Sequence, residues 1–288
     1  RMLRLIRFGI KDGFVIEPDS LIGVKLQHSS IFFISRERIS QELSKILTAP
    51  NSYKGFDLLY ETRLIDFICP ELALLENCTQ DPTFHPEGSV KVHTSLILEH
   101  KKNSAFSSDP VFSLACVFHD VGKPQTWAKT PEGRITAHGH AEEGAIIAER
   151  VLTELKFDNN TISRVVWLVR NHMKPNNFAE MKKSKQAKLI SEPDFPLLLE
   201  LHRLDCLGSN GDTTTVTLIE KIMKELPPER IHPEKLVNGN DLINLGLSPS
   251  PLFKEILEGV EEGQREGKIQ TREEALDLIK KHLTLIEL

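Results

Sequence analysis

Apolar side chains recur at helical spacing along most of this chain, and short polar stretches separate the segments. Ile39, Leu43 and Ile46 show this spacing between residues 34 and 47, and Ser35 is a plausible N-cap. Only residues 126–137 alternate instead, around Pro131-Glu132-Gly133, as in a small β-hairpin. Further helices are expected over residues 56–67, 92–101, 110–119, 141–156, 160–172, 183–190, 196–207, 252–260 and 272–283. The pattern predicts an all-α fold with a small hairpin insertion.

Two proline-containing stretches divide the helical segments into three parts. Pro82 and Pro86 lie in a polar stretch, and Pro227-Pro228 interrupts the chain later. We therefore expect boundaries near residues 80 and 225, which gives parts over residues 1–80, 81–225 and 226–288. Thr271 and Glu274 form the pattern of a capping box in the last part.

Composition limits the classes of protein to which the chain can belong. Its net charge is −5, which argues against a general nucleic-acid binder, although residues 1–55 carry a local charge of +4. No apolar run approaches the ~20 residues that span a bilayer. The four cysteines show no metal-binding spacing and are expected to be reduced thiols, as in a cytoplasmic protein.

The strongest chemical signal is the pair His119-Asp120. It follows an apolar helical segment, and Gly122 and Pro124 stop the helix directly after it. Two side chains that can ligate a metal thus stand at the end of a rigid, buried element, where their geometry can be held.

Further possible ligands surround this pair in the expected fold. The set His93, His119, Asp120 and Asp205 can supply four ligands to one divalent ion, such as Mn, Fe, Co, Ni, Zn or Mg. Asp120 could also bridge to a second ion held by two more histidines, and Lys123 could neutralise phosphoryl oxygens. The two histidines are His140 and His172. Five further histidines are expected to be ordinary core or surface residues: His85, His100, His138, His202 and His282.

The order of these residues, with the run His119-Asp120-Val121-Gly122-Lys123, resembles the HD superfamily of metal-dependent phosphohydrolases. The resemblance implies that His93, His119, Asp120 and Asp205 bind the metal. His140 and His172 are similar to the extra histidines of members that hold two ions. It also implies hydrolysis of a phosphomonoester or phosphodiester, with Asp120 and Lys123 as catalytic residues.

The two ends of the chain resemble a second family. Residues 1–14 and the run Ser35-Arg36-Glu37-Arg38-Ile39 are similar to the neck of bacterial tRNA nucleotidyltransferases and poly(A) polymerases. Arg1 and Arg38 match arginines that contact the nucleotide in that family. Residues 238–251 resemble the helical tail of members that carry an HD domain. The resemblance implies a neck region (1–80), an HD domain (81–225) and a tail (226–288), with RNA, a tRNA 3′ end and a nucleotide as partners.

Nucleotide addition in this family needs a head domain with a Gly-Ser pair and an Asp-x-Asp motif, and no stretch of this sequence combines the two. We therefore expect the chain alone to hydrolyse phosphoesters and not to add nucleotides, with the head encoded upstream, supplied by a separate chain, or missing. Two alternatives remain open. In the first, the HD part is a silent relic within an RNA-binding body. In the second, the chain is a stand-alone nucleotide phosphohydrolase.

Overall fold

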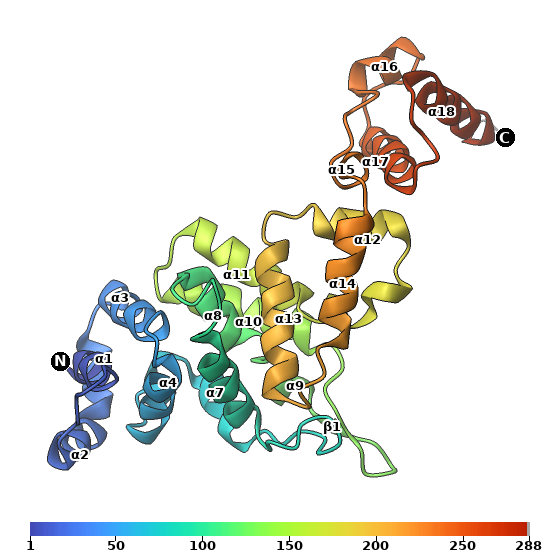
Figure 1. Ribbon diagram of the computed structural model, residues 1–288. Coiled ribbons are helices and arrows are strands. Elements are labelled where there is room, and N and C mark those ends of the chain that lie inside the picture. Colours follow the sequence, from blue (N-terminus) through green and yellow to red (C-terminus); the bar gives the residue numbers. More distant parts are fainter. Residues whose placement is uncertain (287–288) are drawn as a thin grey trace. The chain divides into compact units, whose positions relative to one another are not determined.

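The computed structural model describes residues 1–286 and side chains up to residue 281, so the side chain of His282 lies outside the described part. The prediction of an all-α fold is confirmed. Helices form nearly all of the regular structure (Figure 1), and within residues 1–286 the only sheet is an antiparallel pair, β1 (Ala128–Lys129) and β2 (Ile135–Thr136). This pair is the predicted hairpin.

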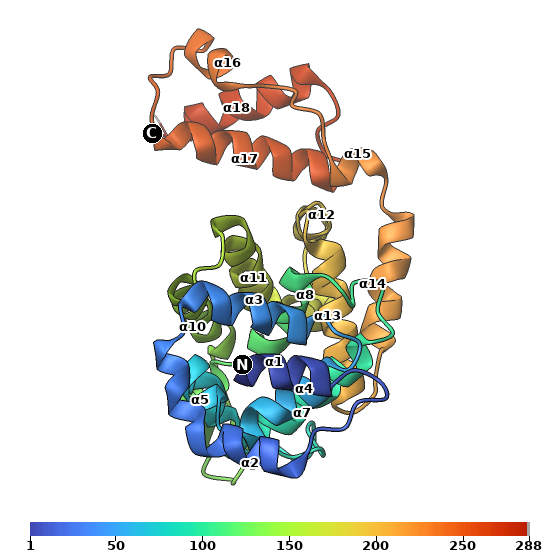
Figure 2. The same ribbon diagram turned by 90° about the vertical axis from the view of Figure 1, so that its left-hand side faces the viewer.

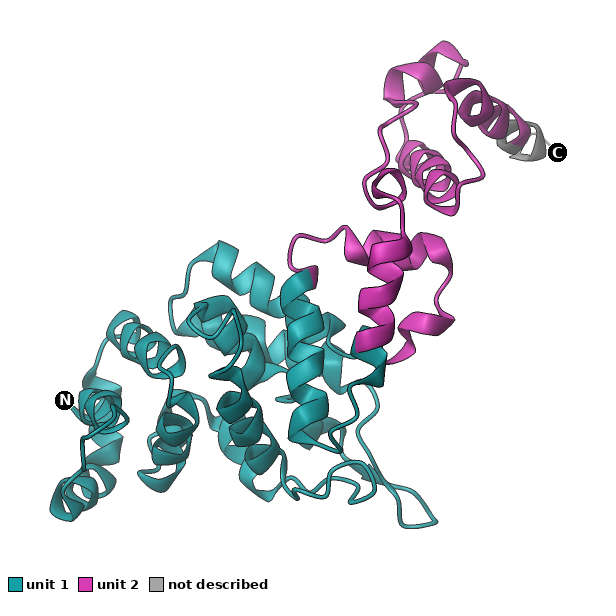
Figure 3. Ribbon diagram, viewed as in Figure 1, with its two compact units in different colours: residues 1–175, 196–216 teal, residues 176–195, 217–288 magenta. Residues whose placement is uncertain are grey.

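The chain forms two compact units (Figure 3). The first contains Arg1–Pro175 and Pro196–Val216, and the second contains Asn176–Phe195 and the chain from Thr217 onwards. The three-part division expected from the sequence concerns resemblance to known families and remains a prediction.

Short helices build the beginning of the first unit, and longer ones follow. The early elements are α1 (Met2–Gly9), α2 (Pro18–Gln27), η1 (His28–Phe33), α3 (Arg36–Leu47), α4 (Ser52–Glu61), α5 (Ile65–Ile68), α6 (Pro70–Ala73) and η2 (Leu74–Asn77). The later ones are α7 (Val90–Lys101), α8 (Pro110–Phe118), α9 (Lys123–Thr126), α10 (His140–Glu154), α11 (Asn159–Asn171) and α13 (Phe195–Gly208).

Helix α8 is the centre of the first unit. Every residue from Val111 to Phe118 is buried, because the helix is apolar on all sides and packs against α3, α7 and α11 (Figure 2). The Asp109 carboxylate accepts a hydrogen bond from the Phe112 amide at 3.0 Å and caps the start of the helix. The end of α8 is therefore fixed by packing on several faces.

Some helix boundaries predicted from the sequence differ from those in the structure. The single helix expected over residues 56–67 is wrong: α4 ends at Glu61, and the short helices α5 and α6 follow. Arg63, with φ of +60°, breaks the helix because a left-handed residue cannot continue a right-handed turn. Ser35 precedes α3 as predicted, but its side chain makes no capping hydrogen bond.

The second unit contains a core of aliphatic side chains around α17 (Pro251–Glu266), including Leu242, Ile256 and Val260. The predicted capping box is confirmed, because Thr271 N–H donates to Glu274 at 3.1 Å and Glu274 N–H donates to Thr271 Oγ1 at 3.2 Å. The other helices are η3 (Lys174–Glu180), α12 (Lys183–Ile190), α14 (Thr214–Glu225), α15 (Pro228–Ile231), α16 (Gly239–Asn244) and α18 (Arg272–Ile286).

Two further expectations concern cysteines and membranes. All four cysteines carry free thiols, as predicted. Among the described residues, every helix is too short or too polar to pass through a lipid bilayer.

Candidate metal centre

The first unit brings the six predicted ligands together from five helices. His93 lies in α7, His119 and Asp120 follow α8 directly, and Asp205 lies in α13. The remaining two stand at helix ends, His140 at the start of α10 and His172 directly after α11. Each of the six residues except Asp205 is at least nine-tenths buried.

Gly122 allows the helices that carry these ligands to approach each other. A Cβ atom on Gly122 would lie 2.2 Å from the backbone oxygen of His140 and 2.5 Å from the backbone nitrogen of Gly144. Both atoms belong to α10 and cannot move independently of that helix. The glycine of the predicted run is therefore required because α10 passes directly against the loop that follows Asp120.

Asp120 lies at the centre of the cluster. Its Oδ2 is 3.2 Å from His119 Nε2 and 3.9 Å from His93 Nε2. Its Oδ1 is 3.4 Å from His140 Nε2 and 3.7 Å from His172 Nε2. Two groups, each with ligand atoms within 4.8 Å of one another, share this carboxylate. The bridging position that the sequence suggested for Asp120 is compatible with this geometry.

Backbone carbonyls determine which ring nitrogen of three histidines carries the hydrogen. Nδ1 lies 3.0 Å from Cys116 O in His119, 2.7 Å from Ala137 O in His140, and 2.6 Å from Val169 O in His172. A carbonyl oxygen only accepts hydrogen bonds, so Nδ1 must be the donor in each ring. Nε2 of each neutral ring therefore presents a lone pair.

These lone pairs face one another. His140 Nε2 and His172 Nε2 are 3.1 Å apart, and Asp120 Oδ1 lies beside both. With both Nδ1 atoms protonated, neither neutral ring has a hydrogen left for this contact. Buried His119 Nε2 likewise has no hydrogen-bond partner among the described residues. Such a group of acceptors without a donor fits a divalent cation, which all of these atoms can ligate.

Asp205 joins the cluster through His93. Its Oδ1 lies 2.9 Å from His93 Nε2, although the two residues are 112 positions apart in the sequence. Burial opposes the charged form of His93, but hydrogen bonds to Asp205 and Glu87 outweigh this effect and raise its pKa to about 9. The same contact with His93 outweighs burial at Asp205 and lowers the pKa of that carboxyl.

Burial and neighbouring charges also shift the pKa values of three other ligands. Burial lowers the pKa of His172 to about 3, and the nearby His119 acts in the same direction. Burial also lowers the pKa of His140. At Asp120 burial acts against ionisation, but His119 and Lys123 together hold the pKa well below its usual range. At Asp120, His140 and His172 the ionised carboxylate and the neutral imidazoles are thus favoured, which are the forms of these groups that bind metals.

Lys123 places a positive charge at the edge of the cluster. Its Nζ lies 2.6 Å from Asp120 Oδ2 and donates a hydrogen bond to Gln80 Oε1 at 2.7 Å. The ammonium group is mostly buried, with 13% of the side chain exposed. It is therefore oriented by Asp120 and Gln80, and it is close enough to the cluster to meet a bound anion.

The sequence reasoning missed two residues at this centre. His85 was expected to be an ordinary core or surface residue, and Glu87 was not singled out, but Glu87 Oε1 lies 2.9 Å from His85 Nδ1 and 2.8 Å from His93 Nδ1. The three residues form a further group of possible ligands. The signal in the sequence was the run His85-Pro86-Glu87, placed directly before the helix that carries His93.

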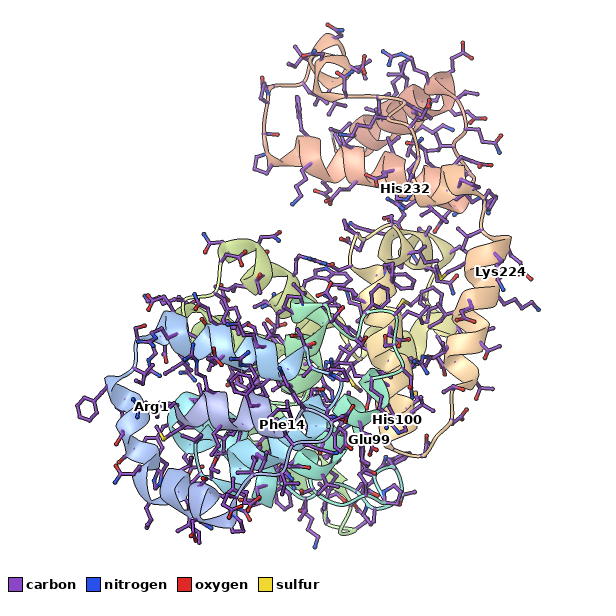
Figure 4. The ribbon with its side chains drawn as sticks, turned by 60° about the vertical axis from the view of Figure 1, so that its left-hand side comes forward. Arg1, Phe14, Glu99, His100, Lys224 and His232 are labelled. Atoms are coloured by element: carbon purple, nitrogen blue, oxygen red, sulfur yellow. The ribbon has the colours of Figure 1, made fainter. Side chains whose placement is uncertain are left out.

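His100, His138 and His202 belong to none of the groups of possible ligands found among the described residues. His100 lies beside Glu99 near the end of α7 (Figure 4), and His138 is exposed. His202 is buried, with Nε2 3.8 Å from Cys206 Sγ. The ordinary roles expected for these three from the sequence remain predictions.

The two predicted nucleotide-contacting arginines lie on one cavity. Arg1, labelled at the N-terminal end of the chain in Figure 4, and Arg38 both line a space of about 160 Å³ formed by α1, η1 and α3. A cavity of ~150 Å³ accepts a benzene ring. Arg4, Lys45 and Glu42 also line the space, so a ring-sized group there would lie among several charged side chains.

Two protein families match parts of the chain. The family described as "Probable RNA and SrmB- binding site of polymerase A" matches residues 13–75, and the one described as "tRNA nucleotidyltransferase domain 2 putative" matches residues 144–279. The chain is homologous to proteins of the tRNA nucleotidyltransferase/poly(A) polymerase family. This family relationship confirms the second resemblance predicted from the sequence at the level of the family.

Individual members of the family align over most of the chain. An A-adding tRNA nucleotidyltransferase of Deinococcus radiodurans is 28% identical over 96% of this chain and 66% of its own length. A CC-adding tRNA nucleotidyltransferase of Thermus thermophilus is 33% identical over 84% and 55%, and a multifunctional CCA protein of Shewanella frigidimarina is 26% identical over 68% and 47%. The chain thus spans about half to two thirds of these relatives.

A solved structure shares the fold. It is titled a complex of a CCA-adding enzyme with CTP, and it superposes with a TM-score of 0.53 at 17% identity, over 98% of this chain and 59% of the other. The matched descriptions name RNA binding and nucleotidyl transfer. The assignment of an HD-type centre therefore remains a prediction that depends on the side-chain geometry.

Proposed function

We propose that the chain is the neck, HD and tail portion of an RNA-processing protein of this family, and that its own centre catalyses metal-dependent phosphohydrolysis. One observation carries the proposal. The Nε2 atoms of His140 and His172 lie 3.1 Å apart beside the Asp120 carboxylate, and no hydrogen joins them when each Nδ1 donates to a carbonyl. A divalent cation held by these side chains would stabilise this arrangement. The substrate class is a phosphomonoester or phosphodiester.

Six residues would hold one or two divalent ions at this centre: His93, His119, Asp120, His140, His172 and Asp205. A bound divalent ion supplies Lewis acidity that activates water and polarises a phosphoryl group. The carbonyls behind His119, His140 and His172 keep each Nε2 directed at Asp120, so the ligand set is oriented before any ion binds.

Lys123 would contact the substrate. Its position between Asp120 and Gln80 fixes a positive charge beside the ligands, where phosphoryl oxygens would lie. Because that charge is already oriented and partly buried, it stabilises negative charge in the transition state without first reorganising.

RNA and nucleotide binding form the second part of the proposal. It is supported by the match of residues 13–75 and by the cavity that Arg1 and Arg38 share. The partners would be a tRNA 3′ end and a nucleotide. Nucleotide addition would in addition need the head domain described above, located upstream or on a separate chain, and the protein would act in the cytoplasm.

Metal content and hydrolysis of a generic phosphodiester test the proposal. The chain is stripped with a chelator, reloaded with Mn²⁺ and compared with Asp120→Ala. Asp277→Asn, which removes an exposed carboxylate in the second unit, is the matched control. We expect bound metal and turnover in the wild type and the control but not in Asp120→Ala. Absence of bound metal and of turnover sensitive to this mutation would favour the alternative of a silent relic within an RNA-binding body.

A gel shift with tRNA at two salt concentrations tests the RNA partner. Binding through basic groups should weaken steeply as salt rises, because counterions are released from the phosphates. Absence of binding at low salt would favour a stand-alone nucleotide phosphohydrolase.

A further inference from the structure

We infer that Glu87 is a positioning residue of the metal centre. Its carboxylate holds the ring of His93 by Nδ1, so that Nε2 is the atom offered to a cation. The inference depends on the proposed metal-binding function and adds to it a residue outside the predicted ligand set.

Glu87 is the nearest acceptor to the outer nitrogen of His93. Its Oε1 lies 2.8 Å from His93 Nδ1, whereas the alternative acceptor, Gly208 O, lies 3.4 Å away. The opposite nitrogen, Nε2, lies 2.9 Å from Asp205 Oδ1 and 3.9 Å from Asp120 Oδ2. The ring therefore bridges Glu87 on one side and the two acidic ligands on the other.

The position of His93 in its helix explains why a side chain is needed there. The other three histidines stand at helix ends, and each uses the carbonyl three residues before it. His93 is the fourth residue of α7, where the nearby carbonyls are occupied. Ser89 O accepts the His93 amide, and Val90 O accepts the Thr94 hydroxyl. Orientation of this ring must therefore come from another segment, and the loop that precedes α7 supplies it.

The carboxylate of Glu87 is buried although only one of its two oxygens is paired. Only 7% of its side chain is exposed, and buried Oε2 has no hydrogen-bond partner among the described residues. Burying a carboxylate with one oxygen unpaired costs free energy. The single oxygen that is paired serves two imidazoles, His93 and His85, whose ring centres are 5.0 Å apart.

A carboxylate behind a metal-binding histidine fixes the ring and raises the basicity of the ligand nitrogen, and its loss costs about 10- to 100-fold in metal affinity. Glu87→Ala removes both effects. Glu87→Gln keeps an oxygen that accepts from Nδ1 but removes the charge. We therefore expect Mn²⁺ to bind about 10- to 100-fold more weakly to Glu87→Ala than to the wild type, with Glu87→Gln between them.

The experiment is a calorimetric titration of Mn²⁺ into the full, metal-stripped chain. Asp81→Asn is the matched control, because Asp81 lies in the same loop, loses the same charge and pairs with Arg134. Its affinity for Mn²⁺ should equal that of the wild type. Urea unfolding of each metal-free variant checks that the fold is retained, and Glu87→Gln provides the comparison if Glu87→Ala does not fold.

The possible results distinguish a failure of this inference from a failure of the proposed function. Equal Mn²⁺ affinity in the wild type and in a folded Glu87→Ala or Glu87→Gln variant would overturn the inference alone. A wild type that binds no Mn²⁺ would overturn the proposed function and the inference together. A graded loss from the wild type through Glu87→Gln to Glu87→Ala, with Asp81→Asn unchanged, supports the positioning role.

Discussion

Gly122→Ala should disrupt the metal centre without removing any ligand. The new Cβ would lie 2.2 Å from His140 O, whereas ordinary contacts begin near 3.4 Å, so the loop and α10 must separate by about 1 Å. The backbone of Gly122 has φ of −81°, which alanine adopts freely, so the effect is purely steric. Overpacking of this kind costs about 1–3 kcal/mol.

The displaced helix carries His140, so the shift should also reach the ligands. A metal site needs its ligands within about 0.5 Å of the productive geometry. We therefore expect Gly122→Ala to lower both the free energy of unfolding in urea and the affinity for Mn²⁺. Gly23→Ala is the control. A Cβ at Gly23, within α2, meets no atom within 4 Å, and alanine there should stabilise the helix by up to ~1 kcal/mol. Wild-type stability together with wild-type Mn²⁺ affinity in Gly122→Ala would refute the steric argument.

Three further predictions concern metal, charge and backbone. Mn²⁺ at about 100 times its Kd should stabilise the metal-stripped chain by ~2.7 kcal/mol, measured as a rise in Tm, and Asp120→Ala should show no such rise. Lys123→Ala should slow phosphodiester hydrolysis by about 10²-fold, because an oriented cation is lost; unchanged turnover would show that Lys123 does not act on the substrate. Lys156→Gly should stabilise the chain by ~1 kcal/mol in urea unfolding, because Lys156 has φ of +63° after α10, whereas Lys156→Ala should give no such gain.

Local pattern was sufficient to predict several long helices of the first unit. The helices α7, α8, α10 and α11 lie where apolar periodicity placed them, because their buried faces repeat at helical spacing. The break at Arg63 was not predicted, since nothing in the local sequence requires a left-handed residue there. Helices α1, α2 and α14 were also missed.

Some residues of the candidate site could likewise be predicted from the sequence, whereas others could be found only from the structure. The types and order of His119, Asp120 and Lys123 identified the chemistry, because ligand type and a helix end are local properties. Glu87 could not be chosen from the sequence, because its importance depends on which carbonyls near His93 are already occupied.

The sequence by itself determined the helical class of this protein, the location of its ligand-bearing segments and its kinship to tRNA nucleotidyltransferases. Only the tertiary structure decided that residues as distant as His93 and Asp205 meet. It also decided that the Nε2 atoms of His140 and His172 face each other beside Asp120. The physical reason is that helix periodicity is set by neighbouring residues, whereas the approach of two helices is set by packing, here by the contact of Gly122 with α10.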